Sequence, residues 1–253
     1  MRHFISFLAL CTLATGAFGQ VAYGTDSDRN LYRIDLPTAT ATLIGNHGQF
    51  LESIARNEST NELYGADNGG NLFSLDVNTG AATLIGDTGL GNLEGMDFAE
   101  DILYATDFSS PASLYVLDPT TAGSSLFVTS DTATGQVRTM AFDESFSVAY
   151  LLADSPTFQT LYAMTPSGVT TGIGSVLTGA GIYGMDVIGG VLWGLSGDGG
   201  VYKIDQSTGD VTFVGDTGDQ FWLGMTSAEA VPEPASMAAL GLGALALLRR
   251  RRA

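Results

Sequence analysis

Cysteine and basic residues are scarce in this sequence of 253 residues. The single cysteine, Cys11, lies in an apolar run near the N-terminus, so no disulfide can brace the rest of the chain. Ten Lys and Arg oppose 27 Asp and Glu, which gives a formal net charge of -17 at pH 7. Because nucleic-acid binding depends on clustered basic residues, we expect this chain to bind no nucleic acid.

Histidine is also rare, and His47 is the only histidine after residue 3. A zinc site made of several histidines is therefore excluded. The sequence contains neither a G-x-S-x-G nucleophile motif nor a phosphate-binding glycine loop. Charged residues make up 15% of the chain and apolar residues 45%, a balance typical of folded chains and not of disordered ones.

The first 19 residues have the order of a secretory signal peptide. Arg2 provides a basic start, residues 4–14 are apolar, and Ala17 and Gly19 are the small residues that a signal peptidase reads. This pattern predicts a helical signal peptide over residues 1–19, with cleavage between Gly19 and Gln20. The chain from Gln20 onward is then exported.

The last 23 residues contain three segments in a fixed order. A Val-Pro-Glu-Pro sequence is followed by the apolar run 235–248, and then by four arginines; these motif residues are Val231, Pro232, Glu233, Pro234, Arg249, Arg250, Arg251 and Arg252. As a helix the 14-residue run would measure about 21 Å, which is short for a hydrocarbon core of about 30 Å. Arginines directly after it indicate stop-transfer, with the preceding chain outside the membrane.

This tail, residues 231–253, resembles the PEP-CTERM sorting signal of Gram-negative bacteria. The resemblance implies recognition by an exosortase near the Pro-Glu-Pro residues, only transient residence in the inner membrane, and loss of the helix. It also implies release or attachment at the cell surface, often together with exopolysaccharide. An ordinary C-terminal membrane anchor is the alternative interpretation.

Residues 20–230 contain five copies of one repeat. The copies start near residues 22, 63, 103, 149 and 192, and their aromatic residues are Tyr23, Tyr64, Tyr104, Tyr150 and Trp193. The intervals between these aromatic residues are 41, 40, 46 and 43 residues. A period in the low forties, built from short apolar runs and Gly/Asn/Asp turns, is typical of propeller blades with four strands each.

The repeat predicts an all-β, five-bladed β-propeller. In the third blade we expect antiparallel strands over residues 93–98, 102–106, 113–117 and 125–129. The domain starts with the second strand of a blade and ends with a spare first strand, over residues 221–226. That last strand should complete blade one, because an open ring would expose a long strand edge.

The innermost strand that we expect in each blade varies in its second position. The residues there are Glu52, Glu94, Arg138, Tyr183 and Leu223, and we expect them to ring one mouth of the central channel. Four aspartates at the ends of the second strands should reach the same face, namely Asp26, Asp67, Asp107 and Asp154. These residues either form a ligand site or serve the structure, for example by pairing Arg138 with a neighbouring glutamate.

Calcium is the one cofactor that this acidic, exported domain suggests. The segment from Asp26 through Asp28 begins like an EF-hand loop, but Leu31 stands where that loop needs glycine. A looser site using Asp26, Asp28 and Asp67 stays open as a candidate. The aspartates of the recurrent D-x-x-T-G turns, such as Asp76 and Asp205, are expected to cap those turns.

The sequence favours an exported, surface-sorted propeller that acts as a non-catalytic binding or matrix protein associated with extracellular polysaccharide. No residue is assigned a catalytic role. One alternative is a glycan hydrolase that uses Glu52 and Glu94 as its two carboxyl groups. A second alternative is a purely structural surface component.

Overall fold

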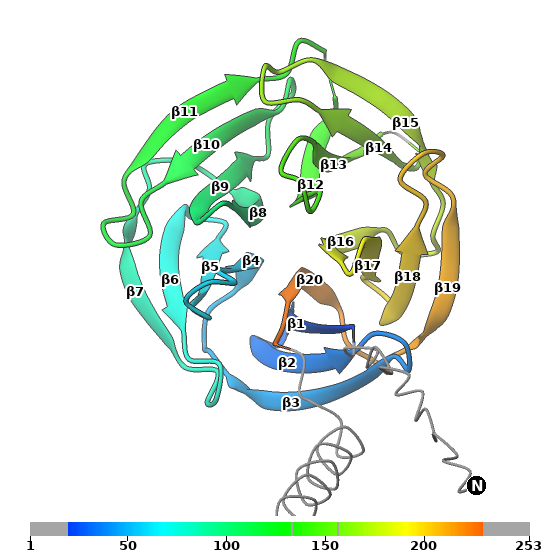
Figure 1. Ribbon diagram of the computed structural model, residues 1–253. Coiled ribbons are helices and arrows are strands. Elements are labelled where there is room, and N and C mark those ends of the chain that lie inside the picture. The colour runs from blue at the N-terminus through cyan, green and yellow to red at the C-terminus, as the bar shows by residue number, and fades with distance from the viewer. Residues whose placement is uncertain (1–19, 133, 156, 230–253) are drawn as a thin grey trace, which may run out of the picture. The chain divides into compact units, whose positions relative to one another are not determined.

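The computed structural model describes residues 20–132, 134–155 and 157–229. The regular secondary structure in these residues consists of β-strands. They form five antiparallel sheets of four strands, arranged as blades around a central axis (Figure 1). The innermost strands are β4 (Leu51–Arg56), β8 (Leu93–Ala99), β12 (Gln136–Phe142), β16 (Ile182–Ile188) and β20 (Trp222–Ser227). The predicted all-β, five-bladed propeller is confirmed.

The other three strands of each blade follow outward in chain order. The second strands are β1 (Val21–Asp26), β5 (Leu63–Asp67), β9 (Ile102–Asp107), β13 (Ala149–Asp154) and β17 (Val191–Ser196). The third strands are β2 (Asn30–Asp35), β6 (Asn71–Leu75), β10 (Ser113–Leu117), β14 (Gln159–Met164) and β18 (Gly200–Ile204). The outer strands are β3 (Thr40–Asn46), β7 (Ala82–Asp87), β11 (Ser124–Thr129), β15 (Thr170–Val176) and β19 (Val211–Asp216).

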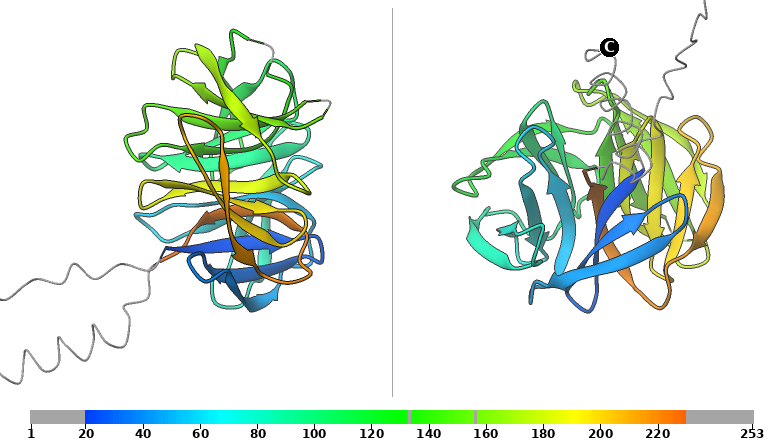
Figure 2. Two further views of the ribbon diagram at one scale, coloured as in Figure 1. Left: turned by 90° about the vertical axis from the view of Figure 1, so that its right-hand side faces the viewer. Right: turned by 60° about the horizontal axis from the view of Figure 1, so that its bottom comes forward.

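The ring closes as the repeat count predicts. The last strand, β20, pairs antiparallel with β1, with Tyr23 opposite Thr226 and Gly24 opposite Met225, so the two ends of the fold share blade one. Figure 2 shows β1 and β20 side by side. The observed strand starts and ends one residue later than the predicted range 221–226.

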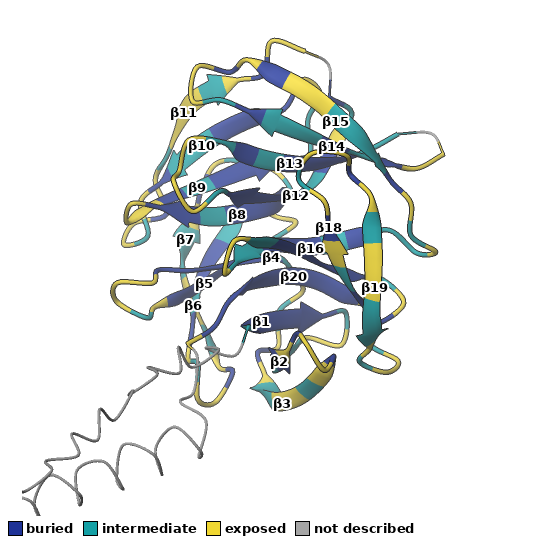
Figure 3. Cartoon of the chain, turned by 45° about the vertical axis from the view of Figure 1, so that its right-hand side comes forward, coloured by how far each residue is buried: buried dark blue, intermediate teal, exposed yellow. Residues whose placement is uncertain are grey.

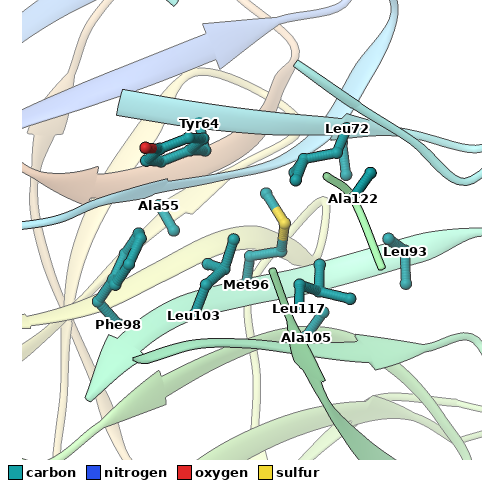
Figure 4. Packing of buried hydrophobic residues seen from close by; sticks show 11 residues of the cluster. Ala55, Tyr64, Leu72, Leu93, Met96, Phe98, Leu103, Ala105, Leu117 and Ala122 are labelled. Carbon is teal, nitrogen blue, oxygen red and sulfur yellow. The ribbon is translucent and has the colours of Figure 1, made fainter. Parts of the chain in front are cut away.

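Burial decreases from the axis outward (Figure 3). All six residues of β20 are buried, whereas β7 has no buried residue. Five apolar clusters fill the spaces between neighbouring blades; in one of them Tyr64 and Leu72 of blade two pack with Met96 and Leu103 of blade three (Figure 4). Each blade therefore buries apolar surface only by contact with its neighbours, as repeat folds generally do.

The recurrent D-x-x-T-G turns join the third and fourth strands. Oδ1 of Asp76 accepts hydrogen bonds from the backbone N–H groups of Asn78 and Thr79, at 2.7 and 3.1 Å. Asp205 makes the same two contacts with Ser207 and Thr208. The expected capping role of these aspartates is confirmed.

These turns also join each blade to the preceding one. A Cβ atom at Gly45 of β3 would lie 2.0 Å from the carbonyl oxygen of Thr79, in the turn of the next blade. Gly174 of β15 has the same relation to Thr208, at 1.9 Å. Any side chain at these two positions would push the neighbouring turn away, so glycine is required by the close approach of two backbones.

The predicted targeting segments lie outside the described residues. They are the signal peptide 1–19 with Gly19, the motif Val231 to Pro234, the helix 235–248 and the arginines 249–252. Within residues 20–132, 134–155 and 157–229, the structure contains no helix long and apolar enough to span a bilayer.

Removing the indole of Trp222 tests the importance of ring closure. Trp222 is fully buried, contacts Tyr32 edge to face at 5.3 Å, and belongs to the cluster between the first and last blades. We expect Trp222→Ala to lower the free energy of unfolding by about 3–5 kcal/mol, as measured by urea denaturation. Phe213→Ala is the control, because Phe213 is 57% exposed. An equal effect of the two substitutions would contradict this role of Trp222.

Candidate functional site

A β-bulge occurs at the same position of every inner strand. In β4, Leu51 pairs with Asp67 and Ser53 with Ala66, so Glu52 has no partner on the neighbouring strand. The same irregularity leaves four other residues unpaired, namely Glu94, Arg138, Tyr183 and Leu223. A bulge turns the extra residue out of the regular ladder. These five residues are the variable second positions of the repeat.

The structure brings four of the predicted mouth residues together around Arg138. The Arg138 Nε donates a hydrogen bond to Asp154 Oδ2 at 2.7 Å, and its Nη1 lies 3.5 Å from Glu94 Oε1. The guanidinium carbon is 5.7 Å from the centre of the Tyr183 ring. The charge of Arg138 also acts on Glu52, whose pKa it lowers against the larger effect of burial.

Two aromatic residues that the repeat comparison did not select complete this site. The Arg138 guanidinium carbon lies 4.3 Å from the ring centre of Phe108, a distance at which cation–π attraction is effective. Phe221 packs against Tyr183 with ring centres 5.2 Å apart. Both residues follow or precede a strand, in loops where the repeat has no fixed residue type, so periodicity carries no signal for them.

Glu94 is the most perturbed carboxyl group at the mouth. Its side chain is 3% exposed, and burial together with the nearby negative charge of Glu52 raises its pKa to about 7. Arg138 and a 2.8 Å hydrogen bond from Asn92 Nδ2 oppose this rise. Near neutral pH, Glu94 can therefore both accept and donate a proton.

The aspartates at the second-strand ends serve different purposes. The carboxylates of Asp26 and Asp67 accept hydrogen bonds from the backbone N–H groups of Asn30 and Asn71, at 2.8 and 2.9 Å, and so fix their own turns. Asp107 accepts hydrogen bonds from Ser109 and from Tyr115. Asp154 instead faces Arg138. All four pair with the start of an inner strand and so lie at the mouth end of their blades, as expected, while the hydrogen bond to Arg138 is made by Asp154.

The candidate calcium ligands are not gathered in one place. Asp28 is exposed, while Asp26 and Asp67 belong to different blades and are engaged in their turns. Across the part of the chain that the structure describes, no three His, Cys, Asp or Glu side chains form a group that could hold a metal ion.

Two further carboxyl groups occupy the fifth position of inner strands, toward the other end of the axis. Asp97 Oδ2 accepts a hydrogen bond from the backbone N–H of Phe142 at 2.8 Å, and Asp186 Oδ2 from that of Ser227 at 2.6 Å. These bonds connect blade three to four and blade five to one. The sequence does contain a signal for these two aspartates, because both inner strands carry a Gly-Met-Asp sequence. The aspartate stands one residue after the last position that the repeat comparison used.

Asp97 and Asp186 are perturbed in the same direction. Burial raises the pKa of Asp186 to about 7, although hydrogen bonds from two backbone N–H groups oppose the rise. Burial and the charge of Asp186 raise the pKa of Asp97. Both groups accept hydrogen bonds from backbone N–H groups within the propeller, so we assign them a structural role.

The C-terminal residues 230–252 match the model of the PEP-CTERM protein-sorting motif. The chain carries a PEP-CTERM sorting motif. The motif implies export and processing by an exosortase, so the protein is a surface-sorted β-propeller. No curated protein matches the sequence.

Among solved structures, the fold is similar to a chain of a nidogen/laminin complex. The TM-score is 0.55, at 15% identity over 84% of this chain and 81% of that one. A gluconolactonase from Xanthomonas campestris matches with a TM-score of 0.48, at 19% identity over 80% and 78% of the two chains. At 15% identity, the likeness to the chain of the nidogen/laminin complex shows the fold alone.

The raised pKa of Asp186 predicts a pH-dependent stability. The unfolded chain releases this proton near pH 4, whereas the folded protein retains it up to about pH 7. The free energy of unfolding should therefore fall as the pH rises through this window, by about 1.4 kcal/mol per pH unit for each additional bound proton. We expect Asp186→Asn to flatten this slope in urea unfolding between pH 5 and 8.

Asp76→Asn is the matched control for this experiment. Asp76 lies in an exposed turn, where hydrogen bonds from Asn78 and Thr79 lower its pKa, so it does not titrate in the same window. An unchanged slope in Asp186→Asn would show that Asp186 does not bind the proton.

Proposed function

We propose that this surface-sorted propeller is a non-catalytic binding protein whose ligand contacts the channel mouth around Arg138. The observation that carries the proposal is the bulge repeated in all five inner strands. The bulge places residues of different chemistry at structurally equivalent positions near the channel mouth. They are two glutamates, an arginine, a tyrosine and a leucine. A repeat that keeps its backbone constant while varying the residue at one position near the channel mouth is suited to recognition.

The mouth offers both hydrogen-bonding and apolar contacts. Arg138 is 27% exposed and is held in place by Asp154 and Phe108, so little side-chain entropy is lost when it binds a ligand. Glu52 is half-buried and supplies an acceptor, while Tyr183 and Phe221 supply aromatic surface. A hydroxyl-rich ligand uses all of these groups, which favours an extracellular polysaccharide or another component of the cell envelope.

The mouth and the C-terminal end of the described chain lie on different faces of the propeller. Leu223 stands near the start of β20, at the mouth, whereas Glu229 lies just beyond the end of β20. Since a strand of six residues spans about 20 Å, these residues lie on opposite faces of the propeller. The mouth is therefore on the face away from the last described residue before the sorting motif.

Binding can be tested with residues 20–229 on a glycan array, with calcium and with a chelator. We expect a polysaccharide ligand whose affinity falls at least about tenfold in Arg138→Gln, because hydrogen bonds to charged groups contribute about 1.5–3 kcal/mol. Arg29→Gln, an exposed cation next to a β1 turn, is the control. The absence of any ligand under both conditions would favour a purely structural protein.

The titration of Glu94 should appear in the same binding measurements. Glu94, with a pKa of about 7, faces Glu52, Arg138 and Asn92. As the pH rises from 6 to 8 the buried Glu94 ionises, and its carboxylate attracts Nη1 of Arg138 more strongly than a neutral acid does, which holds Arg138 in place for the ligand. We expect affinity to increase over this range in the native protein and to stay constant in Glu94→Gln.

One observation favours a second candidate function, glycan hydrolysis. Glu94 has the raised pKa of a general acid, and a second carboxylate, Glu52, lies close enough to influence it. The double variant Glu52→Gln, Glu94→Gln separates the two candidates. Under our proposal, no array ligand is cleaved by the native protein; cleavage that disappears in the double variant would establish the hydrolase instead.

A further inference from the structure

A second cavity lies between blades three and four, on the face opposite the channel mouth. Its volume is about 170 Å³, and the residues at its walls include Glu100, Ile102, Tyr104, Phe127, Phe142 and Phe146. None of these residues contributes to the site around Arg138. An apolar cavity of about 150 Å³ holds one benzene molecule, so this cavity has room for one compact apolar group.

The hairpin between β12 and β13 forms part of the cavity wall. It spans residues 143–148 and is as long as the hairpin 57–62 of blade two, whereas the corresponding hairpins of blades three and five contain two residues each. Phe146 is carried by this hairpin and reaches the cavity wall.

The backbone of Phe146 is held in an unfavourable conformation. Its φ of 54° lies in the left-handed region, which bulky residues rarely adopt. Asp143 braces the hairpin, because its carbonyl oxygen accepts the N–H of Phe146 at 2.8 Å and its Oδ1 accepts that of Val148 at 2.7 Å. Strain that is maintained by surrounding contacts is concentrated at binding and catalytic sites.

At the cavity, the ring of Tyr104 meets two other aromatic rings in edge-type contacts. The Tyr104 ring meets that of Phe142 at 65° and that of Phe127 at 76°, with ring centres 5.1 and 5.3 Å apart. Phe127 and Phe146 remain 45% and 38% exposed. Aromatic side chains therefore contribute to several walls of the cavity, and the exposed parts of Phe127 and Phe146 are in contact with water until a guest binds.

The charge at the cavity is negative. Glu100 is exposed at the cavity wall. The pKa of the Tyr104 hydroxyl is raised, first by the burial of Tyr104 and then by the negative charge of Glu100. The residues that line the cavity include no lysine or arginine. Aromatic faces and a carboxylate both attract a cation, and neither attracts an anion.

We propose that this cavity, which we call the blade 3/4 pocket, binds an organic ammonium group. A trimethylammonium or similar alkylammonium group has the required size. It would contact the rings of Tyr104, Phe127, Phe142 and Phe146, with Glu100 balancing its charge. Quaternary ammonium groups are bound in other proteins by cages of this composition.

The test uses the full-length chain in a maltoside detergent, which carries no cationic headgroup. Choline and its neutral isostere 3,3-dimethyl-1-butanol are titrated separately by calorimetry or by ligand-observed NMR. We expect saturable binding of choline and about tenfold weaker binding of the neutral alcohol. Equal affinity for both would overturn the proposed ammonium site, and so would the absence of saturable choline binding.

Two variants locate the binding. Phe146→Gly removes one wall and places glycine at a positive φ, so it relieves strain and should remain folded; we expect it to weaken choline binding at least fivefold. Glu100→Gln preserves shape and should weaken choline binding without changing that of the neutral alcohol. Full choline affinity in both variants would overturn the proposal.

Phe158→Ala and Arg138→Gln are the controls. Phe158 is 42% exposed but lies in the hairpin after β13, outside the blade 3/4 pocket. Arg138 belongs to the channel mouth, so its substitution should leave choline binding unchanged even if the proposed polysaccharide function is wrong. Loss of choline binding in either control would place the ammonium group elsewhere.

Discussion

The antiparallel pairing of β20 with β1 is the interaction on which the whole ring depends. Every other blade is made of four consecutive strands, but blade one takes its innermost strand from the far end of the domain. The two neighbouring blades also hold the end of β20, since Asp186 of β16 accepts the N–H of Ser227 and Arg56 Nε of β4 donates to the carbonyl of Ser227 at 2.7 Å. The fold is thus complete only when the last residues before the sorting motif are in place.

Each inner strand performs several tasks at successive positions. The bulged second residue is directed to the mouth, and a small third residue allows neighbouring inner strands to approach: a Cβ at Gly184 would lie 2.7 Å from the backbone nitrogen of Met225. The fourth residue fills the core, as Met96 does. The fifth, where it is Asp or Thr, binds the backbone of the next blade. Recognition and blade-to-blade attachment are therefore built into one strand, but at opposite ends of it.

Most of the fold could be predicted from the sequence, because the same apolar runs and turn residues recur in every repeat and mark where each strand begins and ends. The third blade was expected at residues 93–98, 102–106, 113–117 and 125–129, and its strands differ from these ranges by one residue at most. Closure followed from counting strands. Turn roles for aspartates such as Asp76 followed from local hydrogen bonding, which needs no tertiary information.

The candidate site was predictable only where its residues share a repeat position. Glu52, Glu94, Arg138 and Tyr183 align, and so the sequence grouped them. Phe108 and Phe146 belong to loops that differ between blades, and no alignment of repeats marks them. The short hydrogen bond from Arg138 to Asp154 could not be predicted from the sequence either. It depends on the position in space of Asp154, the last residue of β13.

The acidity of the domain has two opposite consequences for its stability. Between residues 20 and 229 there are 26 acidic and five basic residues, a net charge of -21. Turn aspartates such as Asp76 and Asp205 have pKa values lowered by hydrogen bonds from nearby N–H and hydroxyl groups, so they favour the folded state once the pH exceeds about 4. Glu94 and Asp186 have pKa values raised to about 7 by burial, so their contribution is complete below about pH 4 and is lost as the pH rises from about 4 to 7. The two kinds of carboxyl group therefore oppose each other, and stability should be greatest in an acidic environment near about pH 4, where the first contribution is gained and the second is not yet lost.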